Sequence, residues 1–409
     1  MKIAVMGCGT VGSGAAEILE NKVSLLEAKC GEKAELKYIL DIRDLSASPF
    51  ASKVIKDVDI IVKDPEIGVV IETMGGTEPA FTFCMKCLKA GKSVVTSNKE
   101  LVANKADELF AAARENNAAF MFEAAVCGGI PVIRTMFSSL GANNITGFAG
   151  ILNGTTNFIL TKMIKEKMSF DTALKIAQEM GYAEKDPTAD IEGLDACRKT
   201  CILASIVFGT HFLPDEIPTE GITKITLEDA SYAAGAGYEI KLLGRAEKNP
   251  DGSVFACVAP AFTDSASVLG NISGVNNALD VKGDSVGDII LCGPGAGKEA
   301  TASAVIGDVL ECIRLKKNED HYYWAPHKDG ILCKKGENET ALYIRGFAKD
   351  AAKAKTELRE AFGTVRFLSR ENAPANELAF ITEKAKENAL LETLGEIKDF
   401  ASASVIRMY

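Results

Sequence analysis

The sequence predicts an α/β protein with a Rossmann-type doubly wound parallel sheet, an α+β middle domain and a C-terminal ferredoxin-like unit. Three observations support this class. Strands alternate with helices over residues 1–130, a G-x-G-x-x-G turn follows the first strand, and residues 338–409 show the order βαββαβ. A chain of 409 residues also exceeds what one ordinary core holds, so two or three domains are expected.

The N-terminal unit is expected to occupy residues 1–130. Strands that alternate with helices imply right-handed crossovers and therefore a parallel sheet. A glycine-rich stretch at 293–297 and the helical pattern that follows it to residue 316 are expected to return the chain to this unit. The expected strands are 2–6, 36–42, 69–72, 93–96 and 118–123, and the expected helices are 13–28, 80–90 and 106–116.

The middle domain is expected at residues 131–292, where the regular alternation of strands and helices ends. A strand at 145–152 is followed by helices at 158–165, 170–180 and 194–209. Residues 317–323 are polar and predict a loop before the C-terminal unit. In that unit the expected strands are 341–347, 364–369, 378–382 and 401–407, and the expected helices are 350–362 and 383–397.

Composition narrows the class of protein. The formal net charge of -10, without long Lys/Arg runs, predicts no nucleic-acid partner. No apolar run approaches the roughly 18 residues that span a membrane, and the chain enters a strand at residue 2 without a signal-peptide pattern. The 11 cysteines are scattered through apolar stretches, as expected of reduced core residues. These features predict a folded, cytoplasmic protein.

The first turn carries a dinucleotide-binding motif. Gly7, Gly9 and Gly12 form G-x-G-x-x-G, with Thr10 and Val11 between the last two glycines, directly after a strand and at the start of a helix. The glycines allow a tight turn and a close approach of the backbone, and the helix N-terminus offers N–H groups to a pyrophosphate. We therefore interpret the motif as a site for NAD or NADP rather than as a plain tight turn.

The end of the second predicted strand bears on the choice of cofactor. An acid here, such as Asp41, favours NAD, whereas Arg43 could pair with a 2′-phosphate and favours NADP. The sequence supplies both residues, so the preference stays open. Ordinary surface charges at the end of a strand are the alternative interpretation.

Polar residues follow two further predicted strands, at 72–79 and 96–100. The carboxyl ends of strands in an open α/β sheet form the ligand crevice, so Thr96, Asn98 and Lys99 are predicted to face the cofactor. A lysine after a strand is otherwise usually solvated. Its position alone therefore leaves a catalytic role for Lys99 open.

The stretch 180–199 concentrates five carboxylates ahead of two basic side chains at its end. Asp195 and Lys199 are four residues apart, so one helix face presents both. Only three histidines occur and none lies in a glycine-rich or acidic motif, so proton transfer is expected to depend on Lys, Asp, Glu or Tyr. An ordinary surface ion pair is the alternative interpretation.

Taken in series, these motifs resemble the homoserine dehydrogenase family. The resemblance covers residues 1–315 and depends on segments 7–12, 72–76, 96–99, 150–157 and 181–199, which occur in the family's order. It implies the reversible NAD(P)H-dependent reduction of L-aspartate 4-semialdehyde to L-homoserine, in threonine and methionine biosynthesis. The implied cofactor is NADP or NAD. A ferredoxin-like tail has an exposed sheet edge or face that often pairs across subunits, so a homodimer or homotetramer is expected.

The resemblance also assigns roles to residues. Lys199 is implied to donate the proton to the aldehyde oxygen, and Lys99 to assist between the nicotinamide and the substrate. Glu184 and Asp195 are implied to hold the substrate. Two glycines, Gly181 and Gly297, are implied to contact the cofactor.

The loop after the last strand of the first unit resembles the family's monovalent cation loop. Glu123, Val126, Gly128 and Ile130 are implied to bind an ion such as sodium through a carboxylate and backbone carbonyls. From the residues alone, this segment is a glycine hinge.

The sequence departs from the family pattern in two places. Residues 45–50 are neutral where the family often continues with Lys or Arg, so strict NADP preference is not predicted. The C-terminal unit resembles an ACT regulatory domain, but residues 347–352 lack the Pro-Gly turn of its effector loop, so threonine feedback stays open. Two alternative functions remain: another semialdehyde or amino-acid dehydrogenase on the same scaffold, and a nonenzymatic NAD(P)-binding sensor.

Overall fold

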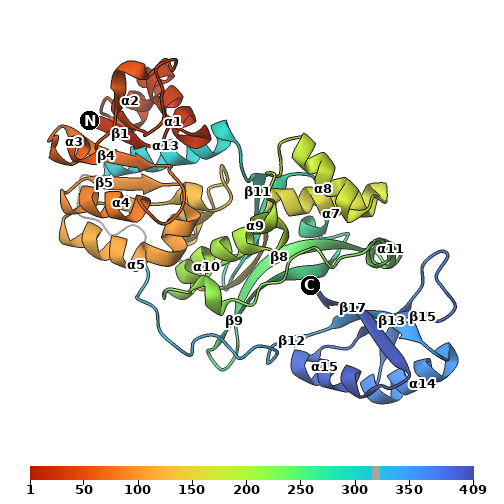
Figure 1. The fold of residues 1–409 in the computed structure, drawn as a ribbon. Coiled ribbons are helices and arrows are strands. Elements are labelled where there is room, and N and C mark those ends of the chain that lie inside the picture. Colours follow the sequence, from red (N-terminus) through yellow and green to blue (C-terminus); the bar gives the residue numbers. More distant parts are fainter. Residues whose placement is uncertain (316–322) are drawn as a thin grey trace.

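In the computed structural model, which describes residues 1–315 and 323–409, the N-terminal unit is built on a six-stranded parallel sheet (Figure 1). The strand order β3-β2-β1-β4-β5-β6 confirms the predicted doubly wound sheet, because the order reverses between β1 and β4. In such sheets the ligand crevice opens at the carboxyl ends beside that reversal. The strands are β1 Lys2–Met6, β2 Glu35–Leu40, β3 Val54–Ile55, β4 Ile67–Glu72, β5 Ser93–Thr96 and β6 Phe120–Met121.

Helices cover both faces of this sheet. The last helix of the unit, α13, comes from far along the chain and packs against α1, β4 and β5 (Figure 1). Its apolar face is buried through residues such as Ala302 and Val305. The helices are α1 Thr10–Asn21, α2 Val23–Cys30, α3 Val58–Lys63, α4 Ala80–Lys89, α5 Lys99–Glu115 and α13 Lys298–Arg314.

Two predicted helices of this unit differ from the structure. The single helix expected at 13–28 is wrong, because the chain leaves helical geometry at Lys22 and divides into α1 and α2. Helix α5 begins at Lys99 instead of residue 106, because the Asn98 side chain accepts a hydrogen bond from the Leu101 N–H at 3.1 Å and caps the helix. The short elements β3 and α3 were not predicted.

The middle of the chain forms an antiparallel sheet, with the order β11-β10-β7-β8-β9, packed against helices. The prediction of one strand at 145–152 was therefore incomplete, because four more strands lie between residues 238 and 294. The strands are β7 Ile145–Ile151, β8 Tyr238–Lys248, β9 Val254–Asp264, β10 Asn276–Gly283 and β11 Gly287–Pro294; the main helices are α7 Gly154–Glu166, α8 Phe170–Glu179, α10 Leu194–Phe208 and α11 Leu227–Gly235.

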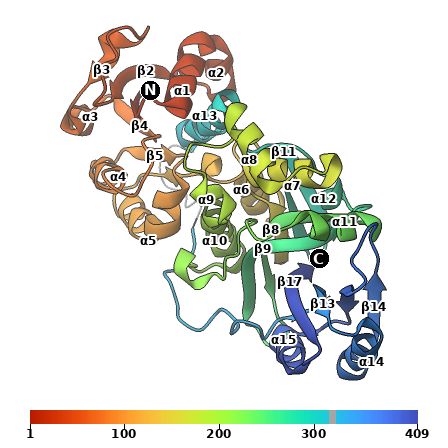
Figure 2. The ribbon, with the colours of Figure 1, turned by 45° about the vertical axis from the view of Figure 1, so that its right-hand side comes forward.

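The C-terminal unit has the predicted βαββαβ order. It consists of β13 Leu342–Ala348, α14 Ala351–Phe362, β14 Val365–Leu368, β15 Glu377–Thr382, α15 Glu387–Glu396 and β17 Phe400–Met408. Strand β17 pairs with β13 on one side and, in parallel, with β9 of the middle domain on the other (Figure 2). The two sheets are thereby one sheet of nine strands, which the sequence did not predict.

Buried side chains reinforce this connection. Asp229 at the start of α11 is fully buried and lies 2.8 Å from the Arg345 Nε of β13. The Tyr343 hydroxyl donates to the same carboxylate at 3.0 Å, and the Tyr343 ring stacks on Phe262 of β9 with centroids 4.3 Å apart. The C-terminal unit is therefore held by main chain, charge and aromatic packing together.

Within the described residues, no helix has both the length and the apolarity needed to cross a membrane. The polar loop expected at 317–323 lies outside the described residues except for Tyr323, which is exposed.

Candidate active site

The glycine motif forms the turn between β1 and α1. Gly7 has a φ of 91°, a backbone conformation that favours glycine. A Cβ on Gly12 would lie 1.9 Å from the Gly7 carbonyl oxygen, so only glycine fits there. Gly9 precedes the first helical residue, Thr10, and Val11 follows it, so the helix N-terminus faces the crevice with its N–H groups. This cradle fits a dinucleotide pyrophosphate.

Asp41 and Arg43 form a pair at the carboxyl end of β2. The Arg43 guanidinium donates to both Asp41 oxygens, at 3.0 Å from Nε and 2.6 Å from Nη2. Asp41 is buried and also accepts the Cys8 N–H of the glycine turn at 2.7 Å. The guanidinium beside it holds the pKa of Asp41 well below its usual range. The carboxylate is thus already occupied, whereas the Arg43 side chain is 56% exposed.

Buried polar groups also join the ends of β4 and β5. The Thr96 hydroxyl donates to Glu72 at 2.5 Å, and Glu72 accepts the Met74 N–H at 2.7 Å. Burial raises the pKa of Glu72 above its usual value. The Asn98 amide donates to the Gly76 carbonyl at 2.6 Å. Thr96 and Asn98 therefore shape the loops of the crevice through their side chains.

Helix α10 places Asp195 and Lys199 on one buried face, as predicted from their spacing. The helix can start sharply because Gly193 adopts a left-handed conformation with φ 81°. Lys199 Nζ donates to Asp195 Oδ2 at 2.8 Å and to the carbonyl oxygen of Leu152 at 2.7 Å. Because only 8% of Lys199 is exposed, the interpretation as an ordinary surface ion pair is wrong.

Lys99 completes this cluster from the N-terminal unit. Its ammonium forms an ion pair with Asp195 Oδ1, so one carboxylate lies between two lysines from different domains. Asn153 donates to Asp195 at 2.9 Å and to Asp190 at 2.7 Å. The structure therefore gathers Lys99, Lys199 and Asp195 where the N-terminal unit meets the middle domain.

Electrostatics fix the charge state of the cluster. Burial alone would raise the pKa of Asp195, but Lys199 and Lys99 outweigh burial and hold it well below its usual range. Burial alone would lower the pKa of Lys199, but the Asp195 carboxylate outweighs it and the pKa is raised. At neutral pH Asp195 is therefore a carboxylate and Lys199 an ammonium group, with a proton available on Lys199.

Other predicted residues lie outside this cluster. Glu184 is exposed on the loop after α8, and its carbonyl accepts from Gln178 at 3.1 Å. Gly181 ends α8 with φ 74°, and Gly297 precedes α13 with φ 115°. Sequence reasoning missed Asn153 as a site residue, although its position just before α7 is typical of a helix cap.

The predicted cation loop is tightly packed. Both oxygens of the buried Glu123 carboxylate accept backbone N–H groups, from Ile133 at 2.8 Å and Arg134 at 2.7 Å. The Ile130 carbonyl accepts from Val132 at 2.8 Å. Gly128 has φ 53° and packs against Gly295, and Val126 is buried next to it. The carboxylate is thus engaged by the start of α6 (Val132–Arg134), and a cation would depend mainly on backbone carbonyls.

Comparisons with known proteins match both the N-terminal unit and the middle domain. A family profile described as homoserine dehydrogenase, NAD binding domain, matches residues 7–123, and a profile described as homoserine dehydrogenase matches residues 131–310. A homoserine dehydrogenase of Helicobacter pylori is 36% identical over 98% of this chain and 96% of its own length. The chain belongs to the homoserine dehydrogenase family. It is an NAD(P)-dependent oxidoreductase.

Further homoserine dehydrogenases extend the comparison. That of Pseudomonas aeruginosa is 40% identical over 86% of this chain and 82% of its own length. The crystal structure of the Thiobacillus denitrificans homoserine dehydrogenase superposes with a TM-score of 0.89 at 33% identity, covering 100% of this chain and 98% of its own. A hyperthermophilic archaeal homoserine dehydrogenase solved with NADPH matches 78% of this chain and 98% of its own, with a TM-score of 0.66 at 29% identity.

Proposed function

We propose that this homoserine dehydrogenase interconverts L-aspartate 4-semialdehyde and L-homoserine with Lys199 as the proton donor and acceptor. The observation that carries the proposal is the geometry of the Lys199 ammonium group. An ammonium has three N–H donors, and two of them already go to Leu152 and Asp195. The third is left for the aldehyde oxygen of the substrate.

The chemistry follows from this arrangement. NAD(P)H, when bound, supplies the hydride to the aldehyde carbon. Negative charge then develops on the aldehyde oxygen, where the Lys199 ammonium stabilises it and transfers a proton to it. Asp195 holds Lys199 in place, and Lys99 adds a second positive charge at the mouth of the site. In the reverse direction, a neutral Lys199 accepts the hydroxyl proton of homoserine.

The substrate also carries an ammonium group, which needs a negatively charged side chain near the position of the aldehyde oxygen. Asp195 carries charge at the centre, and Asp190 lies beside it through the shared Asn153 amide. Glu184 lies on the exposed loop that follows α8. Glu184 and Asp195 are the carboxylates that we assign to the substrate, with Asp190 as a neighbour that restrains Asn153.

Four further parts of the proposal concern cofactor contacts, assembly, location and the cation. The glycine motif, Arg43, Thr96, Asn98, Gly181 and Gly297 line the cofactor side. The chain acts in the cytoplasm as a homodimer or homotetramer, and a monomeric mass in light scattering would contradict that assembly.

The loop at 123–130 binds a monovalent cation such as sodium through backbone carbonyls. Unchanged activity after exchange into choline salts would contradict that site.

The decisive experiment measures L-homoserine oxidation with NAD and with NADP, comparing wild type with Lys199→Ala. We expect the variant to lose about 10²- to 10⁴-fold in kcat, the usual contribution of a positioned acid or base. Lys162→Ala is the matched control, because Lys162 also pairs four residues along a helix, with Glu166 at 2.6 Å, but lies at the surface. Nucleotide binding without turnover by wild type would instead support the sensor alternative.

A further inference from the structure

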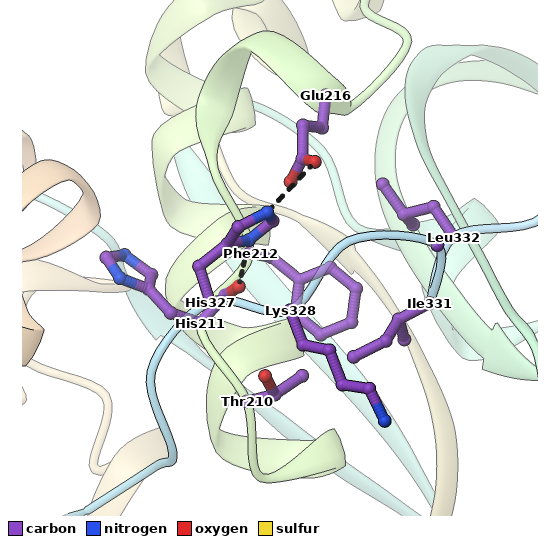
Figure 3. A pocket seen from close by; sticks show the side chains of 9 residues that line it. Thr210, His211, Phe212, Glu216, His327, Lys328, Ile331 and Leu332 are labelled. Atoms are coloured by element: carbon purple, nitrogen blue, oxygen red, sulfur yellow. Dashed lines mark hydrogen bonds and ion pairs between the residues drawn. The ribbon is translucent and has the colours of Figure 1, made fainter.

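A histidine and two carboxylates meet where the segment before the C-terminal unit crosses the middle domain. Glu216 ends a short 3-10 helix, Pro214–Glu216, whereas His327 and Asp329 lie on the connecting segment. Figure 3 shows His327 between the Glu216 carboxylate and the main chain at His211, beside a cavity of about 260 Å³. One ligand atom from each of the three residues lies within 4.8 Å of the other two. None of them takes part in the proposed reaction.

The orientation of His327 limits what its ring can bind. Its Nδ1 lies 3.0 Å from the His211 carbonyl oxygen, which can only accept, so Nδ1 carries a hydrogen. Nε2 points at two carboxylates, 3.4 Å from Glu216 Oε1 and 3.1 Å from Asp329 Oδ1. In a neutral ring Nε2 would then present a lone pair to two anions. The arrangement therefore needs a positive charge at Nε2, supplied either by a proton or by a metal ion.

The distances suit a metal ion. Zinc bonds of about 2.0 Å in a tetrahedral site place neighbouring ligand atoms about 3.3 Å apart, close to both separations from Nε2. Glu216 is held for this role, because its other oxygen accepts the Leu213 N–H at 3.3 Å. The Nδ1 hydrogen bond to a backbone carbonyl is the support that metal-binding histidines usually have.

We propose that Glu216, His327 and Asp329 bind a divalent transition-metal ion of the Zn²⁺ class, with water as a further ligand. Imidazole nitrogen with carboxylate oxygen is a donor set that such ions accept. Asp329 is fully exposed at its side chain, so the ion would be reached from solvent.

The ion would fasten the connecting segment to the middle domain. That segment already contacts the N-terminal unit, because the Trp324 indole donates to Asp107 of α5 at 3.1 Å and the His327 N–H donates to the same carboxylate at 3.3 Å. The Nδ1 atom of His211 in the middle domain lies 2.9 Å from Oδ1 of Asp107. Metal binding at His327 would therefore strengthen the contacts of the connecting segment with the N-terminal unit and the middle domain.

The test uses the full chain after treatment with a chelator that removes bound metal. The cysteines are kept reduced by a reductant that is not itself a thiol. Zn²⁺ binding is measured by calorimetry, and Co²⁺ is added to report the ligand type by absorption. We expect one site in wild type, weakened about tenfold or more in His327→Gln and in Glu216→Gln. Asp215→Asn, a neighbouring exposed carboxylate, is the matched control and should bind like wild type.

Three results would overturn the proposal. Equal Zn²⁺ affinity in wild type and His327→Gln would place the ion elsewhere. Thiolate charge-transfer bands with Co²⁺ would assign binding to one of the cysteines. No Zn²⁺ binding, together with a protonated His327 ring in NMR spectra, would assign the cluster to an imidazolium ion pair. Thermal unfolding of each variant without metal checks that a loss of binding is not a loss of folding.

Discussion

The middle domain meets its two neighbours through junctions of different kinds. Toward the N-terminal unit it offers polar side chains at the crevice, such as the Asp195 that pairs with the 39% exposed Lys99. Toward the C-terminal unit it offers the backbone of β9 and the buried pair of Asp229 and Arg345. The first junction must admit a cofactor and a substrate, and its Lys99 side chain stays partly exposed beside the buried Asp195. The second is held by main-chain pairing and by a buried ion pair.

Breaking the first junction should affect activity most. Asp195→Asn removes the negative charge between Lys99 and Lys199 while nearly preserving side-chain volume. We expect kcat for homoserine oxidation to fall about 10²- to 10³-fold, comparable with the loss of a preorganised polar group in other active sites. Steady-state kinetics checks this. Retention of more than half of the wild-type kcat would remove Asp195 from the mechanism.

Breaking the second junction should affect stability instead. Asp229→Asn leaves the Arg345 guanidinium, 5% exposed, without its anion, and removing one partner of a buried pair costs about 3–5 kcal/mol. The free energy of unfolding from urea titration measures this cost. Lys386→Ala is the control, because its pair with Glu337 is exposed and exposed pairs contribute about 0–1 kcal/mol. If Asp229→Asn and Lys386→Ala lower the free energy of unfolding equally, the second junction does not depend on its buried ion pair.

The pH dependence of the reaction tests the roles of Lys199 and Asp195 at the first junction. Homoserine oxidation needs neutral Lys199, whose pKa is raised by Asp195 despite burial. The rate should therefore rise with pH, about tenfold per unit below that pKa, and the reduction should show no such alkaline rise. In Asp195→Asn the rise should begin at lower pH, because the charge that raises the pKa is gone. A flat profile from neutral to about pH 10 would exclude a lysine base.

The smallest expected effect concerns Arg43, at the edge of the crevice. If its exposed guanidinium pairs with a 2′-phosphate, Arg43→Ala should raise the KM for NADP about tenfold or more, since hydrogen bonds to charged groups contribute about 1.5–3 kcal/mol. The KM for NAD should stay the same. Parallel titration of both nucleotides provides the measurement, and an equal change for both would assign Arg43 to general folding of the turn.

Local patterns in the sequence predicted two features of the candidate site, the glycine turn and the common helix face of Asp195 and Lys199. The glycine turn and the four-residue spacing of Asp195 and Lys199 depend on neighbours along the chain, so the sequence contains them directly. The contact of Lys99 with Asp195 joins residues from different domains and was not predicted, although the family resemblance implied that both residues belong to the site. Asp190 and Asn153 were missed as site residues because their hydrogen bond joins the start of α7 to a residue 37 positions further along the chain.

The sheet of the middle domain was largely missed. Strand β9 is buried along nearly its whole length, so its sequence lacks the polar and apolar alternation that marks a half-exposed strand. Strand β10 mixes Asn277 and Asp280 with apolar residues although all of them are buried. The pairing of β17 with β9 links residues 407 and 261 and has no local signature at all.

That pairing has a consequence for how the molecule folds. Until residues 400–408 reach β9, the middle-domain sheet has an open edge with unsatisfied backbone groups, and so has β13. The contact closes a long loop, a step that slows folding and prolongs exposure of such edges. A chain interrupted within the C-terminal unit before β17 would keep both edges open, so such truncated products should aggregate more readily than the full chain.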